Sequence, residues 1–306
     1  MRKAFINKLA ESARKDGRIC LIVGDLGYSV VEDFAREFPD RFLNAGVAEQ
    51  SMLGIASGWS LAEKKIVFVY SLGNFPTMRC LEQIRNDCCL HKANVKIVSV
   101  GSGITYGQSG YSHFAIEDLA VMRALPNISI FSPADPAEAG ICLDLMIRTE
   151  GPAYIRIAKT GEAVLERKNK EFQLGDYVEY RKGKDLCLIG IGTIISECLS
   201  AAEQLREDLS SAVIGIPVFK PLREDLLVEY LKGFSSIATV EEHSSCGGLA
   251  SVVGEIIARH GIKVNFLKLA LPEGFNKTGS QSDLRSLCGL SAGEIASLVR
   301  RFMNNA

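Results

Sequence analysis

Short apolar runs alternate with amphipathic stretches along the whole 306-residue chain, and this alternation constrains the fold more than any other feature. The runs are rich in Val and Ile, are bounded by Gly, Pro or Asp, and read ICLIVGD, IVFVYSL, VKIVSVG, ISIFSPAD, AYIRIA, DLCLIGIG, SSAVIGIPV, SSIATVEEH and VNFLKLAL. Strands that are apolar on both faces are typical of a parallel sheet covered by helices on each side. The sequence therefore predicts an α/β protein.

A charge-rich stretch, residues 160–184, interrupts the alternation and sustains no apolar period. We expect a domain over residues 1–162, a linker over 163–184 and a second domain over 185–306, each with a mainly parallel sheet flanked by helices. The second domain restarts with a strand and a glycine-bearing turn at 190–193, which leads into a helix over 194–205. The full G-x-G-x-x-G spacing of a dinucleotide site is absent there.

Composition excludes several classes of function. The formal net charge of −1 provides no strong positive field, so nucleic acid is not expected as a partner. No apolar run approaches the roughly 20 residues that span a bilayer, and the amino terminus is polar, so we expect no membrane partner and a cytoplasmic location. The nine cysteines form no C-x-x-C pair and are predicted to be reduced core residues.

The segment RFLNAGVAEQSMLGIASGWSLA contains the first candidate for chemistry. A loop at Asn44 to Gly46 precedes a helix that begins near Glu49, and Gly54 and Gly58, four residues apart, predict that another segment packs closely against this helix. An acidic residue in a first turn is favoured by the helix dipole whatever its function. The neighbours of Glu49 are small or apolar, however, so we expect its carboxyl group to be buried and available for acid–base chemistry.

Seven segments occur in the order and at about the spacing of the carboxy-terminal half of transketolases, and the chain resembles that family over nearly its whole length. They are GDLGYS, RFLNAGVAEQSMLGIASG, NFPTMRCLEQIRND, YGQSGYSHFAIEDLAVMRALPN, FSPADPAEA, GPAYIRIAK and TVEEHSSCGGLASVVGE. The resemblance implies a pyrimidine-binding domain followed by a transketolase carboxy-terminal domain. It also implies transfer of a two-carbon ketol unit from a ketose (phosphate) to an aldose (phosphate), with thiamine diphosphate as cofactor.

The resemblance assigns two catalytic residues. Glu49 would hydrogen-bond the N1′ nitrogen of the aminopyrimidine and so activate the cofactor, and His113 would face the reacting part of the substrate. Glu117 and Asp118, which follow His113, are interpreted as charges at the start of a helix.

By the same resemblance, Leu72, Phe75 and Met78 line the slot for the pyrimidine ring, with Phe75 in the stacking position. Many transketolases have further aromatic residues at the other two places, so this slot is less aromatic than usual.

Arg2, Ser29 and Lys159 match residues that bind the substrate phosphate, with Lys159 where an arginine is usual. Long single-chain transketolases have a histidine at the position of Gly101 and an aspartate at that of Ser109. These differences call the usual pentose-phosphate substrates into question.

No metal site is recognisable. The Gly-Asp-Gly motif that anchors the diphosphate through a divalent cation is absent, and Gly24-Asp25-Leu26 belongs to a different family segment. We expect Mg²⁺, or Ca²⁺ or Mn²⁺, to be held by a separately encoded first-half subunit. The predicted assembly is an α2β2 heterotetramer. The cluster Glu241, Glu242, His243 in the second domain is interpreted as a strand end before a turn, without a catalytic role.

Three alternatives stay open at the level of sequence. Two share the cofactor: the beta chain of a 2-oxoacid dehydrogenase, and an enzyme like 1-deoxyxylulose-phosphate synthase. The third is a non-catalytic interaction or regulatory subunit that kept the fold.

Overall fold

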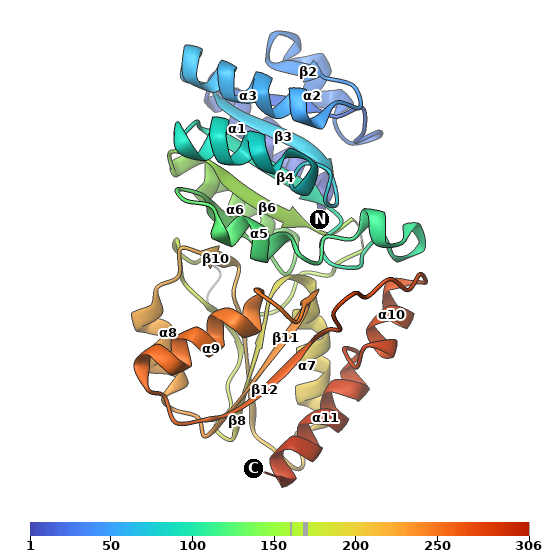
Figure 1. The fold of residues 1–306 in the computed structure, drawn as a ribbon, viewed down its shortest axis with the longest axis vertical. Coiled ribbons are helices and arrows are strands. Elements are labelled where there is room, and N and C mark those ends of the chain that lie inside the picture. The colour runs from blue at the N-terminus through green and yellow to red at the C-terminus, as the bar shows by residue number, and fades with distance from the viewer. Residues whose placement is uncertain (160, 168–170, 306) are drawn as a thin grey trace.

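The structure, a computed structural model, describes residues 1–159, 161–167 and 171–305. Two sheets lie one above the other along the long axis of the molecule (Figure 1). The first has the order β10-β5-β6-β4-β3-β1-β2, and all neighbours are parallel except β10 and β5. Its strands are β1 (Ile19–Val23), β2 (Phe42–Asn44), β3 (Ile66–Leu72), β4 (Val95–Val100), β5 (Ser129–Phe131), β6 (Ala153–Ile157) and β10 (Val218–Lys220).

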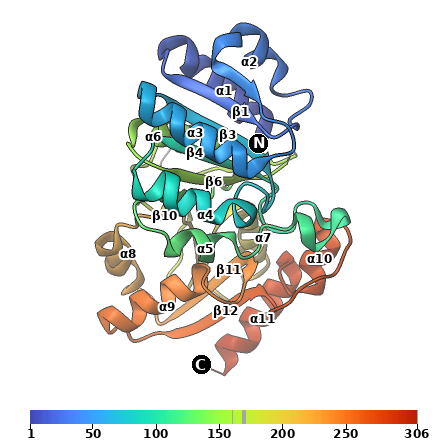
Figure 2. The same cartoon turned by 45° about the horizontal axis from the view of Figure 1, so that its top comes forward.

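Helices cover both faces of this sheet, which is why its strands are continuously apolar. One face packs on α1 (Arg2–Lys15) and α6 (Pro136–Arg148). The other packs on α3 (Glu49–Glu63), on α4 (Leu81–Gln83) with the π-helix that continues it over Ile84–Leu90, and on α5 (Asp118–Ala124) (Figure 2). The short α2 (Glu32–Glu37) precedes β2, and single 3-10 turns occupy Pro39–Arg41, Met78–Cys80, Gly107–Ser109 and Tyr111–His113.

The second sheet has the order β12-β11-β8-β9-β7, parallel except for the pair β7 and β9. Its strands are β7 (Val178–Arg181), β8 (Leu186–Gly190), β9 (Ser211–Gly215), β11 (Ser236–Ser244) and β12 (Asn265–Leu271). One face packs on α7 (Ile195–Gln204), α10 (Gln281–Leu287) and α11 (Ala292–Asn304), the other on α8 (Glu224–Leu231) and α9 (Leu249–His260). The predicted helix over 194–205 is thus α7, preceded by a 3-10 turn at Gly192–Ile194, and the predicted α/β class is confirmed.

Two strands differ from the predicted division into domains. β7 lies inside the segment 163–184 that was expected to be a linker, and it forms the edge of the second sheet. β10 comes from the second half of the chain but pairs with β5 of the first sheet. Both are short edge strands, so neither has the long apolar run by which the other strands were recognised. Residue 160, in the expected first domain, and residues 168–170, in the expected linker, lie outside the described residues.

The loop between β4 and α5 is built into the core of the second domain. Ile104, Phe114 and Ile116 are buried there in one apolar cluster with residues of β12 and α10. The rings of Phe114 and Phe275 are stacked, with centroids 6.1 Å apart and planes 18° apart. The second domain therefore fixes the position of a loop that belongs to the first.

Asp118 is fully buried, so the interpretation of it as an ordinary helix-start charge was incomplete. It does lie in the first turn of α5, but its carboxylate pairs with the buried guanidinium of Arg156 at 3.2 Å and accepts a 2.6 Å hydrogen bond from the Tyr154 hydroxyl. Glu117 precedes the helix and accepts a hydrogen bond from the Tyr111 hydroxyl at 3.1 Å. The ion pair between Asp118 and Arg156 therefore joins α5 to β6.

The acidic cluster at the end of β11 has structural contacts that account for it. Glu241 accepts hydrogen bonds from the backbone N–H groups of Leu249 and Ala250 at the start of α9, at 2.6 and 2.8 Å. Glu242 is paired with Arg285 of α10. Burial lowers the pKa of His243, which lies 3.9 Å from Glu241.

All nine cysteines are free, and seven of them are buried as predicted, but Cys246 is exposed and Cys288 only partly buried, so the prediction of a core position is wrong for these two. Among the described helices, none combines the length and the apolar character that crossing a membrane would require.

Replacing Asp118 with Ala leaves the Arg156 guanidinium buried without its counter-charge. We expect the free energy of unfolding to fall by about 3–5 kcal/mol, as for other broken buried pairs. Asp33→Ala, which removes an exposed pair with Arg36, is the control and is expected to change stability by less than about 0.5 kcal/mol. Urea unfolding measures both. Equal effects of the two substitutions would contradict a structural role for the buried pair.

Burial raises the pKa of Glu241 from 4.5 to about 7, against the opposing effect of its two backbone hydrogen bonds and of the nearby charges of Arg156 and Lys268. The folded chain thus holds this proton more tightly than the unfolded chain. The contribution of this proton to the free energy of unfolding is therefore complete below pH 4.5 and is lost as the pH rises to about 7.

Glu241→Gln cannot ionise at this position. We therefore expect its free energy of unfolding to depend less on pH between pH 4.5 and about 7 than that of the wild type. The measurement is urea unfolding across that window, with Glu273→Gln on the exposed surface as control. An unchanged slope in Glu241→Gln would refute the assignment.

Candidate active site

The predicted site residues gather at the carboxyl edge of the first sheet, where parallel α/β proteins bind their ligands. Strands β1, β3, β4 and β6 all run toward this edge. The segments that follow them, and the start of α3 after β2, hold Glu49, Phe75, Gly101 and Lys159.

Glu49 is the first residue of α3, and its side chain is buried, with 2% exposed. Its Oε1 accepts a 3.3 Å hydrogen bond from the Ser71 hydroxyl, and its Oε2 lies 2.6 Å from a guanidinium nitrogen of Arg79. The structure thus has the helix start and the burial that the sequence predicted. It also places beside Glu49 a charged partner, Arg79, that the sequence analysis did not single out.

Phe75 and His113 continue the arrangement that begins at Glu49. The Arg79 guanidinium lies over the Phe75 ring, 4.4 Å from its centroid, and the rings of Phe75 and His113 meet edge to face at 5.3 Å. The Nδ1 atom of His113 is 2.9 Å from the Ser112 hydroxyl. We refer to Glu49, Arg79, Phe75 and His113 as the Glu49 row.

Gly73 allows the His113 loop to approach β3 closely. It has a φ of +55°, and a Cβ there would lie 2.5 Å from the carbonyl oxygen of His113. Leu72 and Met78 lie before and after Phe75 in the chain, half-buried and 36% exposed respectively. The structure therefore puts all three predicted slot residues at the same edge of the sheet.

Tyr106 connects the Glu49 row to the positively charged residues that were matched to phosphate binding. Its ring lies 6.4 Å from that of His113, and the Lys159 ammonium is 5.2 Å above it. Burial raises the pKa of Tyr106, and the charge of Arg2 opposes this effect. A cavity of about 230 Å³ lies here, lined by Tyr106, Lys159 and residues of both domains.

Three further positions were compared with substrate-binding residues of the family: Gly101, Ser109 and Ser29. A Cβ at Gly101 would overlap the Tyr106 ring, so Tyr106 occupies the space beside Gly101 that a larger side chain would need. Ser109, in the next 3-10 turn, lines the same cavity. Ser29 is exposed and its backbone N–H donates to Glu32, and in the described part of the chain no hydrogen bond joins it to Arg2 or Lys159.

The glycine face of α3 is open, which corrects one expectation. A Cβ built at Gly54 or Gly58 would meet nothing within 4 Å, so no segment of the described chain packs closely there. Three apolar side chains on or next to this helix are also exposed: Val47, Ile55 and Leu61.

The contacts of the Glu49 row fit an aminopyrimidine ring. A buried carboxyl group beside an aromatic face provides a hydrogen-bonding partner for a ring nitrogen and a surface on which the ring can stack. The described residues contain no group of three or more His, Cys, Asp or Glu side chains that could hold a metal ion. Asp25, at the end of β1, is hydrogen-bonded to Asn44 and Tyr28 instead.

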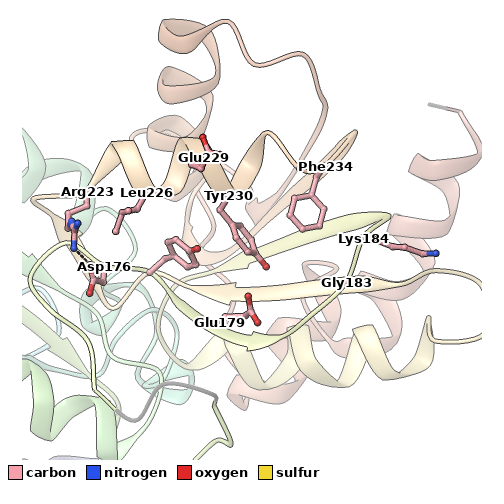
Figure 3. A pocket seen from close by; sticks show the side chains of 11 residues that line it. Asp176, Glu179, Gly183, Lys184, Arg223, Leu226, Glu229, Tyr230 and Phe234 are labelled. Atoms are coloured by element: carbon pink, nitrogen blue, oxygen red, sulfur yellow. Dashed lines mark hydrogen bonds and ion pairs between the residues drawn. The ribbon is translucent and has the colours of Figure 1, made fainter.

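A cavity of about 750 Å³ lies elsewhere, in the second domain between β7 and α8 (Figure 3). It is lined by Tyr177, Tyr230 and Phe234, with Glu179 below them and the Asp176–Arg223 ion pair at one end. It shares no residue with the Glu49 row.

Comparison with known proteins finds two domains in this chain. The model of the transketolase pyrimidine binding domain matches residues 1–161, and that of the transketolase C-terminal domain matches residues 175–295. An apulose-4-phosphate transketolase subunit of Actinobacillus succinogenes is 32% identical, with 94% of each chain covered. A split-gene transketolase, solved as an inactive beta4 tetramer, is 33% identical with a TM-score of 0.89, covering 99% of this chain and 98% of that one.

The human transketolase is 30% identical over the whole of this chain, which spans 49% of the human protein. The two family models together cover most of the 306 residues, in the order pyrimidine-binding domain, then carboxy-terminal domain. The two sheets follow one another along the chain in the same order, and the Glu49 row lies at the carboxyl edge of the first sheet. The chain therefore belongs to the transketolase family, whose cofactor is thiamine diphosphate.

Proposed function

We propose that this chain is the pyrimidine-binding subunit of a two-chain transketolase. The complex transfers a two-carbon ketol unit from a ketose, or ketose phosphate, to an aldose, or aldose phosphate. The observation that carries the proposal is the buried carboxyl group of Glu49, which is connected through Arg79 to the Phe75 ring in a row that ends at His113. Two relatives whose names say that they are transketolase subunits, and which this chain covers over 94% and 92% of their length, support the proposal.

Glu49 is the residue that holds N1′ of the aminopyrimidine, and Phe75 provides the face on which that ring stacks. Leu72 and Met78 complete the slot. When bound, thiamine diphosphate supplies the nucleophilic carbon to which the two-carbon unit is attached during transfer. Burial of Glu49 keeps water from competing for the carboxyl group.

His113 acts at the substrate. Its Nδ1 is engaged by Ser112, which orients the ring and leaves Nε2 to hydrogen-bond a substrate oxygen or to relay its proton. Lys159, which lies over the Tyr106 ring, and Arg2 provide the positive charge for a substrate phosphate. Ser29 is the third member of this set; it is exposed and is hydrogen-bonded to neither residue.

A first-half subunit covers the glycine face of α3. Gly54 and Gly58 leave room for the close approach of another chain, and the exposed Ile55 and Leu61 provide the apolar surface that an interface core requires. That subunit supplies the ligands for Mg²⁺, or for Ca²⁺ or Mn²⁺, and binds the diphosphate. The assembly is an α2β2 heterotetramer in the cytoplasm, acting in carbohydrate metabolism.

The function is tested with a ketol-transfer assay on the chain mixed with its first-half subunit, thiamine diphosphate and Mg²⁺. We expect activity only in the mixture. Glu49→Gln keeps the size of the side chain but cannot exchange a proton with N1′, so it should reduce kcat by at least about 100-fold. Glu63→Gln, at the exposed end of the same helix, is the control.

Two results would count against the proposal. Full activity of Glu49→Gln would show that the complex needs no carboxyl group at this position, as in a non-catalytic subunit. Turnover of 2-oxoacids in place of ketoses would move the chain to the dehydrogenase beta subunits.

The interface is tested separately. Ile55 is 44% exposed, so Ile55→Asp should leave the fold intact while placing a charge in the interface core. We expect its affinity for the first-half subunit to fall by about tenfold or more. Leu287→Asp, 64% exposed on α10, is the matched control. Unchanged binding of Ile55→Asp, measured by calorimetry, would place the partner on another face.

A further inference from the structure

Arg79 makes the two contacts that the proposed function assigns to the aminopyrimidine. One nitrogen of its guanidinium is 2.6 Å from Oε2 of Glu49, and the guanidinium carbon lies 4.4 Å from the centroid of the Phe75 ring. A guanidinium is planar, donates hydrogen bonds to a carboxylate and stacks on aromatic faces. Arg79 thus combines stacking on Phe75 with a hydrogen bond to Glu49, as the cofactor ring would.

The arginine and the cofactor ring compete for the same carboxylate oxygen. Glu49 is 2% exposed, and its Oε1 already accepts the hydrogen bond from Ser71. Within the described residues Oε2 accepts a hydrogen bond from Arg79, and Oε2 is the oxygen that we assign to the ligand.

Of the two partners in this ion pair, Arg79 is the one that is free to move. Its side chain is 44% exposed, and within the described residues its polar contact is to Glu49 alone. Glu49 is fixed at the start of a buried helix. A buried carboxylate without a partner is unfavourable, so the ion pair stabilises the chain as long as no ligand is bound.

We propose that Arg79 occupies the aminopyrimidine slot of the unloaded chain and leaves it when the cofactor binds. Arg79 is therefore a positioning residue that protects Glu49 and sets the affinity for thiamine diphosphate. The inference rests on the proposed function, because it takes Glu49 and Phe75 as the cofactor's partners.

The test is the dissociation constant of thiamine diphosphate for the complex with the first-half subunit and Mg²⁺, measured by calorimetry. In Arg79→Gln the competing ion pair is gone, and we expect binding about fivefold tighter, the scale of a partly exposed pair. Arg79→Lys keeps the charge but cannot stack as a planar group, and its dissociation constant should lie between those of the wild type and Arg79→Gln. Arg85 is exposed on the π-helix Ile84–Leu90 that follows α4, so Arg85→Gln is the matched control and should bind thiamine diphosphate as the wild type does.

A merely structural role for Arg79 would weaken binding in Arg79→Gln, as would a direct contact between Arg79 and the bound cofactor. Either weaker or unchanged binding overturns the inference.

A second measurement uses the wild-type complex and needs no substitution. Phenylglyoxal modifies accessible guanidinium groups, and peptide mass spectrometry locates the modified residue. We expect the reactivity of Arg79 to rise when thiamine diphosphate is added, while that of Arg85 stays constant. Unchanged or reduced reactivity of Arg79 contradicts its release.

Failure of the proposed function and failure of the role of Arg79 give different results. If the wild-type complex binds no thiamine diphosphate, the proposed function itself is wrong. If it binds the cofactor and transfers ketol units, but Arg79→Gln binds no more tightly, only the role of Arg79 is wrong.

Discussion

The geometry of the site depends on the burial of three apolar side chains, Ile104, Phe114 and Ile116, in the core of the second domain. They belong to the loop that carries Tyr106 and His113, whereas Glu49 begins α3 and Phe75 follows β3, both in the first domain. A loop held only by its two ends would leave His113 free to move relative to Phe75. Burying these three side chains fixes it, because removing large apolar groups from water stabilises their packed position by several kcal/mol. The row from Glu49 to His113 is therefore a property of both domains.

The first sheet also depends on the second half of the chain. β10, from the second half of the chain, completes the first sheet beside β5, and the Lys220 ammonium donates to the carbonyl oxygens of Arg123 and Leu125 at the end of α5. Asp118 of that helix is paired with Arg156 in the central strand β6. The second domain has no residue in the Glu49 row, yet it closes the edge of the sheet from which the row is built and holds the loop that completes it.

The sequence predicted the parts of this structure that follow from one-dimensional patterns. Strands covered on both faces must be apolar throughout, so β1, β3, β4 and β8 were visible as runs. Glu49 was conspicuous because a carboxyl group among small and apolar neighbours has few ways to remain solvated. Arg79 gave no such signal, since an arginine next to a loop is usually a solvated charge, and only the fold brings it over Phe75. The open face at Gly54 and Gly58 was misjudged because a glycine spacing does not say which chain approaches it.

Gly101 and Tyr106 show a further limit of matching residues position by position. At Gly101 the chain lacks the side chain that long transketolases have, which by itself suggests a lost contact. The structure shows that Tyr106, five residues later, fills that space from the side, between His113 and Lys159. The local volume is thus retained while its chemistry changes, because a half-buried phenol with a raised pKa stays neutral where an imidazole would titrate. Positive charge in this part of the site then comes from Lys159, which lies over the Tyr106 ring, and from Arg2, whose charge acts on the Tyr106 hydroxyl.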